Sequence, residues 1–243
     1  MKEIAIITLH SIEPNYGNCL QNYAVQTVFN SLGFGTITEL YRNKYFYKKD
    51  ILKILVLKLS CGMVPRADER YIKYCKKLSF QKFYDKYIKS LKHRKVTEIS
   101  DKYDFYSVGS DQVWNYKWYK ADDCSRFLLS FVDSANKISF SPSFGVESID
   151  ENWQEVYTNE LSKFKAVSVR EKAGADIIKK LTGRDATVIV DPTMLLTKED
   201  WNRISKKPKG IERNGYILKK YLAQTSDKAR ETLENVSKGF KVY

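Results

Sequence analysis

Histidine is almost absent from this 243-residue chain, which contains only His10 and His93. Two histidines so far apart in the sequence exclude a histidine-rich metal site. Cysteine is also scarce, and the spacings of its four residues match no zinc-binding pattern. These cysteines are Cys19, Cys61, Cys75 and Cys124. We therefore expect four free thiols in a reducing compartment and no metal.

Long hydrophobic runs are missing too. No window of about 18 uncharged apolar residues occurs, so nothing in the sequence predicts a membrane-spanning helix. The start of the chain, Met1 to Ile4, leads directly into a strand-like segment without the apolar region of a signal peptide. The sequence therefore predicts a cytoplasmic protein. With 43% apolar and 14% aromatic residues, the chain is globular and long enough for one domain and part of another.

Acidic residues are sparse in one segment. Residues 44–95 hold sixteen lysines and arginines against four acids, which is +12 of the chain's total of +13. Apolar positions at helical spacing predict two or three helices here, broken near Gly62 and Pro65. Three interpretations stay open for this basic insertion. It is a solvated helical face, it binds an anionic surface such as the inner leaflet, or it binds nucleic acid, for which no motif is present.

Outside the insertion, short β-rich runs alternate with amphipathic stretches. The expected strands are 4–9, 36–41, 105–108, 137–140, 166–169 and 187–190. The expected helices are 18–29, with Asn18 as its N-cap, 151–163 and 173–181. Strands alternating with helices predict an α/β fold, with a Rossmann-like parallel sheet covered by helices on both faces.

A cluster of polar residues follows each of five expected strands. The clusters are 15–18, 109–112, 141–145, 170–171 and 191–193. The carboxyl ends of parallel strands meet at one edge of a sheet, and ligands of open α/β folds bind in the crevice there. The sequence therefore predicts one shared site built from these clusters.

The last part of the chain changes character. Residues 206–210, Lys-Lys-Pro-Lys-Gly, are typical of a linker. A strand at 216–222, a helix at 227–237 and the start of another strand at 240–243 follow. We expect an N-terminal α/β domain over 1–205 and, over 206–243, a linker and the incomplete start of a second α/β domain.

Five motifs in order now resemble one family. They are Asn-Tyr-Gly-Asn at 15–18, Val-Gly-Ser-Asp-Gln-Val-Trp-Asn at 108–115, Ser-Phe-Gly at 143–145, Ser-Val-Arg-Glu at 168–171 and Val-Asp-Pro-Thr at 190–193. Together they resemble the polysaccharide pyruvyl transferases, over about residues 4–222 without the insertion.

The resemblance implies a two-domain fold similar to GT-B glycosyltransferases. It also implies transfer of the enolpyruvyl carbons of phosphoenolpyruvate to sugar hydroxyls of a surface glycan or lipid-linked glycan, as a pyruvate ketal, without a cofactor. The family's general acid is expected to be a histidine of the second domain, and no residue here matches it. We therefore expect this chain to be incomplete for catalysis. Two alternatives stay open: a non-catalytic glycan- or anion-binding domain, and a nucleotide-sugar glycosyltransferase of the GT-B type.

The chemistry of the donor selects candidate residues. A donor with a carboxylate and a phosphate needs a guanidinium and helix N-termini, which Arg170 and the Gly17–Asn18 turn supply together with Ser110. Asp111 is the candidate for orienting or deprotonating the sugar hydroxyl. The candidate acceptor-binding residues are Asn15, Gln112 and Trp114.

Each candidate also has a purely structural interpretation. Arg170 could only form an ion pair with Glu171 or Asp191, Asp111 could only shape a turn, and Trp114 could belong to the core. Asn15, Gly17 and Asn18 could likewise serve only the turn before the helix.

Overall fold

The computed structural model describes residues 1–9, 15–41, 48–64, 66–93, 98–99, 102–118, 121–132, 136–207, 210, 216–219 and 225–242. His10 lies outside these described residues. The chain divides into two compact units, Met1–Lys198 and Glu199–Tyr243.

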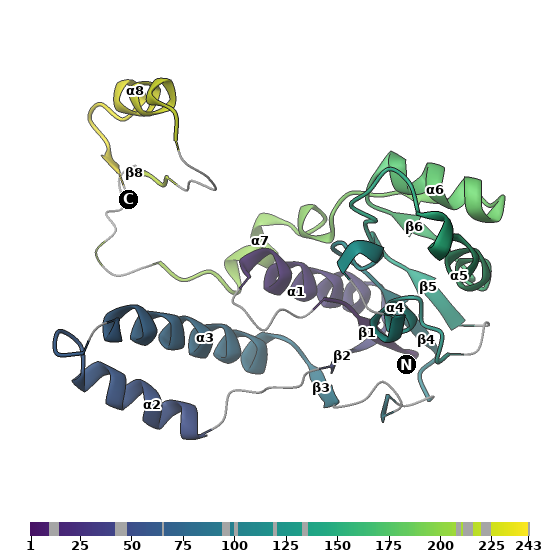
Figure 1. Ribbon diagram of the computed structural model, residues 1–243, viewed down its shortest axis with the longest axis horizontal. Helices are drawn as coiled ribbons and strands as arrows, with labels where there is room; N and C mark the ends of the chain where they lie inside the picture. The colour runs from purple at the N-terminus through teal and green to yellow at the C-terminus, as the bar shows by residue number, and fades with distance from the viewer. Residues whose placement is uncertain are drawn as a thin grey trace. The chain divides into compact units, whose positions relative to one another are not determined.

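The first unit is built on a five-stranded parallel sheet with the order β3-β2-β1-β4-β5 (Figure 1). The strands are β1 (Glu3–Ile7), β2 (Gly35–Tyr41), β3 (Ser90–His93), β4 (Phe105–Val108) and β5 (Lys137–Ser139). Beyond β5, the backbone amide of Ser139 donates to Ala166 O at 3.1 Å, and Ile138 and Ala166 form a parallel bridge. This bridge leads to the parallel pair β6 (Ser168–Val169) and β7 (Thr187–Val188).

The strand order fixes where a ligand can bind. From β1, the chain winds outward to β2 and β3, then returns to the other side of β1 for β4 and β5. The winding direction therefore reverses between β1 and β4, and the crevice at such a point is where doubly wound sheets bind ligands. The predicted Rossmann-like parallel sheet is confirmed.

Helices cover both faces of the sheet because alternate residues of each strand point to opposite sides. Ile4 and Ile6 of β1 pack with Val25 and Phe29 of α1 (Tyr16–Ser31). The residues between and after them, Ala5 and Ile7, belong to a larger cluster on the other face. That cluster includes residues of α4 (Ala121–Phe127), α5 (Glu151–Leu161) and α6 (Lys172–Thr182). The predicted two-sided covering is thus confirmed.

The basic insertion forms a helical hairpin between β2 and β3. Its helices are α2 (Lys48–Leu59) and α3 (Ala67–Tyr87), which pack against each other, as the predicted break near Gly62 requires. The C-terminal part of α3 packs on α1, with Cys19, Tyr84 and Ile88 in one buried cluster.

Two sequence expectations near these helices are wrong. The spacing of six apolar residues predicts one helical stripe, Phe80, Phe83, Tyr84, Tyr87, Ile88 and Leu91. Ile88 is already extended, however, with φ −121° and ψ 113°, and Leu91 lies in the edge strand β3. The predicted N-cap of the first helix is Asn18, but the N-cap of α1 is Asn15, whose side chain accepts a hydrogen bond from the Asn18 backbone amide at 3.2 Å. The helix therefore begins at Tyr16, two residues before Asn18.

The remaining elements are short. The first unit also contains the 3-10 turns η2 (Tyr116–Trp118) and η4 (Pro192–Met194). At and beyond its boundary lies α7 (Lys198–Asn202). The second unit pairs β8 (Tyr216–Ile217) in parallel with β9 (Lys241–Val242), and α8 (Asp227–Val236) connects them. The expected strand-helix-strand order is present there.

Candidate functional site

The site begins where β1 and β4 end side by side. Thr8 follows β1, and its hydroxyl donates to the backbone oxygen of Ser110, which follows β4, at 3.4 Å. Gln21 of α1 donates through Nε2 to Thr8 Oγ1 at 3.3 Å. These bonds attach the first helix to both central strands, so the N-terminus of α1 has a fixed position at the switch point.

The loop after β4 has a backbone that only particular residues adopt. Gly109 has φ +124°, and a Cβ there would lie 2.2 Å from Phe140 O, so no other residue fits without movement. Asp111 has φ +71°, a conformation that aspartate tolerates better than most residues. Its Oδ1 accepts from the Gln112 amide at 2.9 Å. Left-handed non-glycine residues of this kind concentrate at functional sites.

Asn18 connects this loop to the first helix and to the insertion. Its Nδ2 donates to Asp111 Oδ2 at 3.5 Å, and its Oδ1 accepts from the Tyr84 hydroxyl at 3.4 Å. Asn18 is buried, whereas Asp111 is partly exposed. The α3 helix of the insertion therefore contacts a residue of the candidate site directly.

Arg170 is held at the same edge by a carboxylate. Its Nη1 lies 3.2 Å from Asp191 Oδ2, and the same oxygen accepts from Ser110 Oγ at 3.2 Å. Burial opposes ionisation of Asp191, but hydrogen bonds from the Thr193 amide and hydroxyl, Arg170 and Ser110 outweigh it and lower its pKa. The ion pair expected under the structural interpretation of Arg170 is therefore present.

A second carboxylate lies beside Arg170. Glu171 Oε2 is 3.8 Å from Arg170 Nε, and Glu171 Oε1 accepts from the Phe144 amide at 3.1 Å. Glu171 and Asp191 thus place two carboxylates beside one guanidinium. These carboxylates would repel a polyanionic ligand at this edge. Such a ligand would have to displace Asp191 from Arg170 or be bound by positive charges from another part of the protein.

The sequence-predicted residues fall into two groups. In the first group, the Asn18 side chain donates to Asp111, which is the residue after Ser110. Ser110 and Arg170 both donate to the carboxylate of Asp191. In the second group, Asn15 is exposed at the N-cap of α1 and Gly17 is exposed in its first turn.

The other candidate acceptor residues differ from each other. Gln112 is partly exposed, and its Oε1 accepts from Asn115 Nδ2 at 2.9 Å. Trp114 is fully buried, packs on Phe144, and donates through Nε1 to Phe127 O at 3.0 Å. Its ring presents no face to a sugar in this conformation, so its place is in the core, as the simpler interpretation held.

Three residues of this neighbourhood are not among the individual candidates that the sequence selected. Thr8 was counted within a strand, and Tyr84 belonged to an apolar helical stripe whose contacts no local pattern reveals. Ser141, with φ +55°, donates through Oγ to Val190 O at 3.0 Å. Of the three, only Ser141 could be anticipated from the sequence, because it is the first residue of the polar cluster 141–145.

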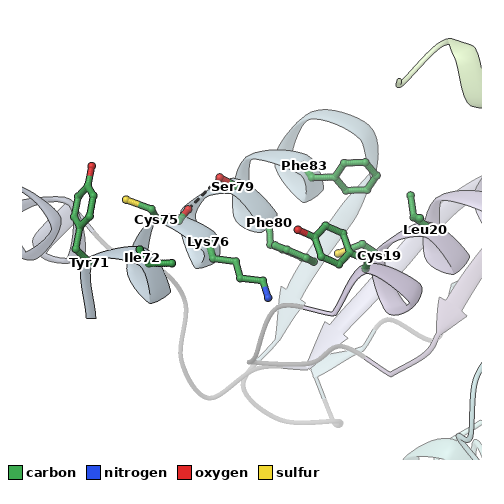
Figure 2. Close-up of a pocket in the computed structure, with 10 residues that line it drawn as sticks. Cys19, Leu20, Tyr71, Ile72, Cys75, Lys76, Ser79, Phe80 and Phe83 are labelled. Atoms are coloured by element: carbon green, nitrogen blue, oxygen red, sulfur yellow. Dashed lines mark hydrogen bonds between the residues drawn. The ribbon is translucent and has the colours of Figure 1, made fainter. Parts of the chain in front are cut away.

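An apolar pocket of about 600 Å³ borders the site between α1 and α3. Figure 2 shows Phe80 of α3 pointing toward Cys19 of α1. Tyr16 and Cys19, which line the pocket, flank Gly17 and Asn18 in the sequence. The pocket therefore adjoins the α1 side of the candidate site. In the part of the chain that the structure describes, no group of three or more metal-ligating side chains is placed to hold an ion.

Comparison with known proteins identifies the family. The family model described as polysaccharide pyruvyl transferase matches residues 15–239. No curated protein and no solved structure matches the chain. The matched range contains the Asn18–Asp111 and Ser110–Asp191–Arg170 contacts and nearly the whole sequence. The chain belongs to the polysaccharide pyruvyl transferase family.

Proposed function

We propose that this protein transfers the pyruvyl group of phosphoenolpyruvate to a sugar of a surface polysaccharide and forms a pyruvate ketal. Membership of the family supports a transferase acting on a polysaccharide. The observation that carries the finer proposal is that Arg170 and Ser110 both donate to Asp191 at the carboxyl edge of the sheet, where Asp111 directly follows Ser110.

The proposed donor fits Arg170 chemically. Phosphoenolpyruvate carries a carboxylate and a phosphate, and a guanidinium can bind either group through two parallel N–H bonds. Arg170 lies one residue before Glu171, the N-cap of α6, and the N-terminal dipole of this helix favours an anion at the same place. In the proposal, one anionic group of the donor replaces Asp191 as the partner of Arg170. Gly17 and Asn18 at the start of α1, with Ser110, hold the other end.

The reaction balances without a cofactor. One sugar hydroxyl adds to C2 of the donor and gives up its proton, while the methylene carbon of the donor gains one. A second hydroxyl of the same sugar then displaces phosphate from C2, which closes the ketal. Asp111 is the proposed group that orients or deprotonates the attacking hydroxyl, because its carboxylate is partly exposed and fixed by Asn18 and the Gln112 amide.

The acceptor is proposed to approach from the α1 side. Asn15 and Gln112 offer polar contacts for a sugar, and Trp114 contributes packing alone. The pocket between α1 and α3 would accept the apolar part of a lipid-linked glycan. The proposed place of the reaction is the cytoplasm.

Genetics can test the function without an assumption about the acceptor. Deleting the gene in the source organism should remove the pyruvate methyl signal from the proton NMR spectrum of its purified surface polysaccharide. The wild-type gene should restore this signal, and Asp111→Asn should not. A ketal that persists in the deletion strain would contradict the proposed function. A ketal that Asp111→Asn restores as well as the wild-type gene does would contradict the role of Asp111.

A further inference from the structure

The helix α2 exposes a row of large apolar side chains. Leu52, Leu55, Val56 and Leu59 are each between 55% and 69% exposed. We call these four residues the α2 ridge. At about 100° per residue, they lie within a stripe about 100° wide on one side of the helix. Met63 and Val64, in the turn after α2, are also exposed and extend the apolar surface.

The opposite side of α2 is already occupied. Ile54 and Leu57 are partly buried, and α2 packs against α3. Among the elements that the structure describes, α3 is the one against which α2 makes its extensive contacts. A surface helix normally has one apolar side and one polar side. This helix has two apolar sides, and the second one faces outward from the hairpin.

Basic side chains border the ridge. On the helical wheel, Lys53 and Lys58 lie about 110° to either side of the centre of the ridge, and both are exposed. Arg66 and Arg70, at the start of α3, are also exposed. These residues belong to the segment 44–95, which carries +12. The surface therefore combines an apolar ridge in the middle with Lys53 and Lys58 on either side of it.

We propose that the α2 ridge docks the protein onto an anionic lipid bilayer. An apolar stripe flanked by lysine and arginine is what a helix lying in the membrane interface requires. Twelve residues of helix span only about 18 Å, which is too short for a hydrocarbon core of about 30 Å. In the described part of the chain, no helix is long and apolar enough to cross a membrane. The helix therefore lies along the surface with its ridge among the lipid chains.

Charge distinguishes the bilayer from other occupants of the ridge. A second copy of the chain would bring another +12 segment against this one, so self-association would be opposed by repulsion. Nucleic acid would match the charge but would leave the apolar ridge in water. An anionic bilayer satisfies both parts of the surface, since it places negative head groups beside an apolar interior.

Docking would also tether the candidate site to the membrane. The hairpin is attached to the site through α3, because Tyr84 donates to Asn18. The pocket between α3 and α1, drawn in Figure 2, lies along the same connection. The docking proposal does not depend on the transferase activity.

Liposome co-sedimentation of the whole chain tests the docking. The protein should bind vesicles of phosphatidylglycerol and phosphatidylcholine at least about tenfold more strongly than vesicles of phosphatidylcholine alone. Binding should weaken as salt screens the charges. Leu55→Gln with Leu59→Gln should weaken binding about tenfold or more because both side chains lose their place in lipid.

Two controls keep the result specific. Val156→Gln with Leu218→Gln removes two exposed apolar side chains outside the hairpin, and this variant should bind as the wild type does. Circular dichroism should show unchanged helix content in all variants, since the replaced side chains are exposed. Equal binding to both vesicle types, or wild-type binding by the ridge variant, would overturn the proposal. A concentration-dependent dimer that the ridge variant abolishes, without vesicle binding, would overturn it in favour of a second copy.

Discussion

Replacing Arg170 tests the proposed donor site at the residue on which it depends most. Arg170→Ala removes the guanidinium that would bind an anionic group of phosphoenolpyruvate. Loss of a charge-assisted hydrogen bond costs about 1.5–3 kcal/mol, which is about 10- to 150-fold in affinity. Arg170→Lys keeps the charge but loses the planar pair of donors, so it should fall between Arg170→Ala and the wild type.

The fold should survive both replacements. The side chains of Arg170 and Asp191 are 29% and 24% exposed, so their ion pair is partly solvated and is worth about 1 kcal/mol or less. Asp191 Oδ1 keeps its bonds from Thr193 N and Oγ1 at 3.0 and 2.7 Å. Lys179→Ala is the matched control, because it removes one positive charge from the last turn of α6, the helix that Arg170 precedes.

Ligand-observed NMR or calorimetry with phosphoenolpyruvate measures the effect. We expect binding in the order wild type and Lys179→Ala, then Arg170→Lys, then Arg170→Ala. Unchanged binding by a folded Arg170→Ala variant would show that Arg170 is a structural ion-pair residue only. The donor site would then have to lie elsewhere.

Three further predictions concern the surroundings of the site. The pKa of Asp191 is lowered in the folded protein, so its ionisation stabilises the fold at neutral pH, and this contribution is lost as the pH falls below about 4. In urea titrations repeated across pH, Asp191→Asn should lose less stability on acidification than the wild type does. Trp114→Ala should destabilise the protein by about 3–5 kcal/mol, measured by the urea midpoint, because it empties a fully buried site; a cost below 1 kcal/mol would contradict its place in the core. Asn18→Ala removes the bonds to Asp111 and Tyr84 and should cost about 1–3 kcal/mol in the same assay, whereas no change would mean that these contacts are not maintained in solution.

The sheet was predictable because its pattern is local. Strands such as Ile4–Ile7 are buried on both faces and read as continuous apolar runs. The edge strand β3 was not predictable, since Ser90–His93 is polar and partly exposed and directly follows a helix. A four-residue edge strand offers no apolar run of its own, so its pairing with β2 appears only in three dimensions.

The site was predictable only in part, for a related reason. Strand topology brings Ser110, Asp111 and Arg170 to one edge, and the chain order implied this. The contact of Tyr84 with Asn18 joins residues 66 positions apart, and helical spacing alone marked Tyr84 as packing. Trp114 could have been exposed or buried with the same sequence around it. Its burial depends on Phe144 and Phe164, which approach it from other elements.

The most direct test of the central claim is a two-dimensional amide NMR titration of the protein with phosphoenolpyruvate. We predict that the amides of Ser110, Asp111, Gln112 and Arg170 shift with the donor, together with those of Gly17 and Asn18. A uridine diphosphate sugar should leave the same amides unchanged. Shifts caused by the nucleotide sugar and not by phosphoenolpyruvate would contradict the account and favour a glycosyltransferase.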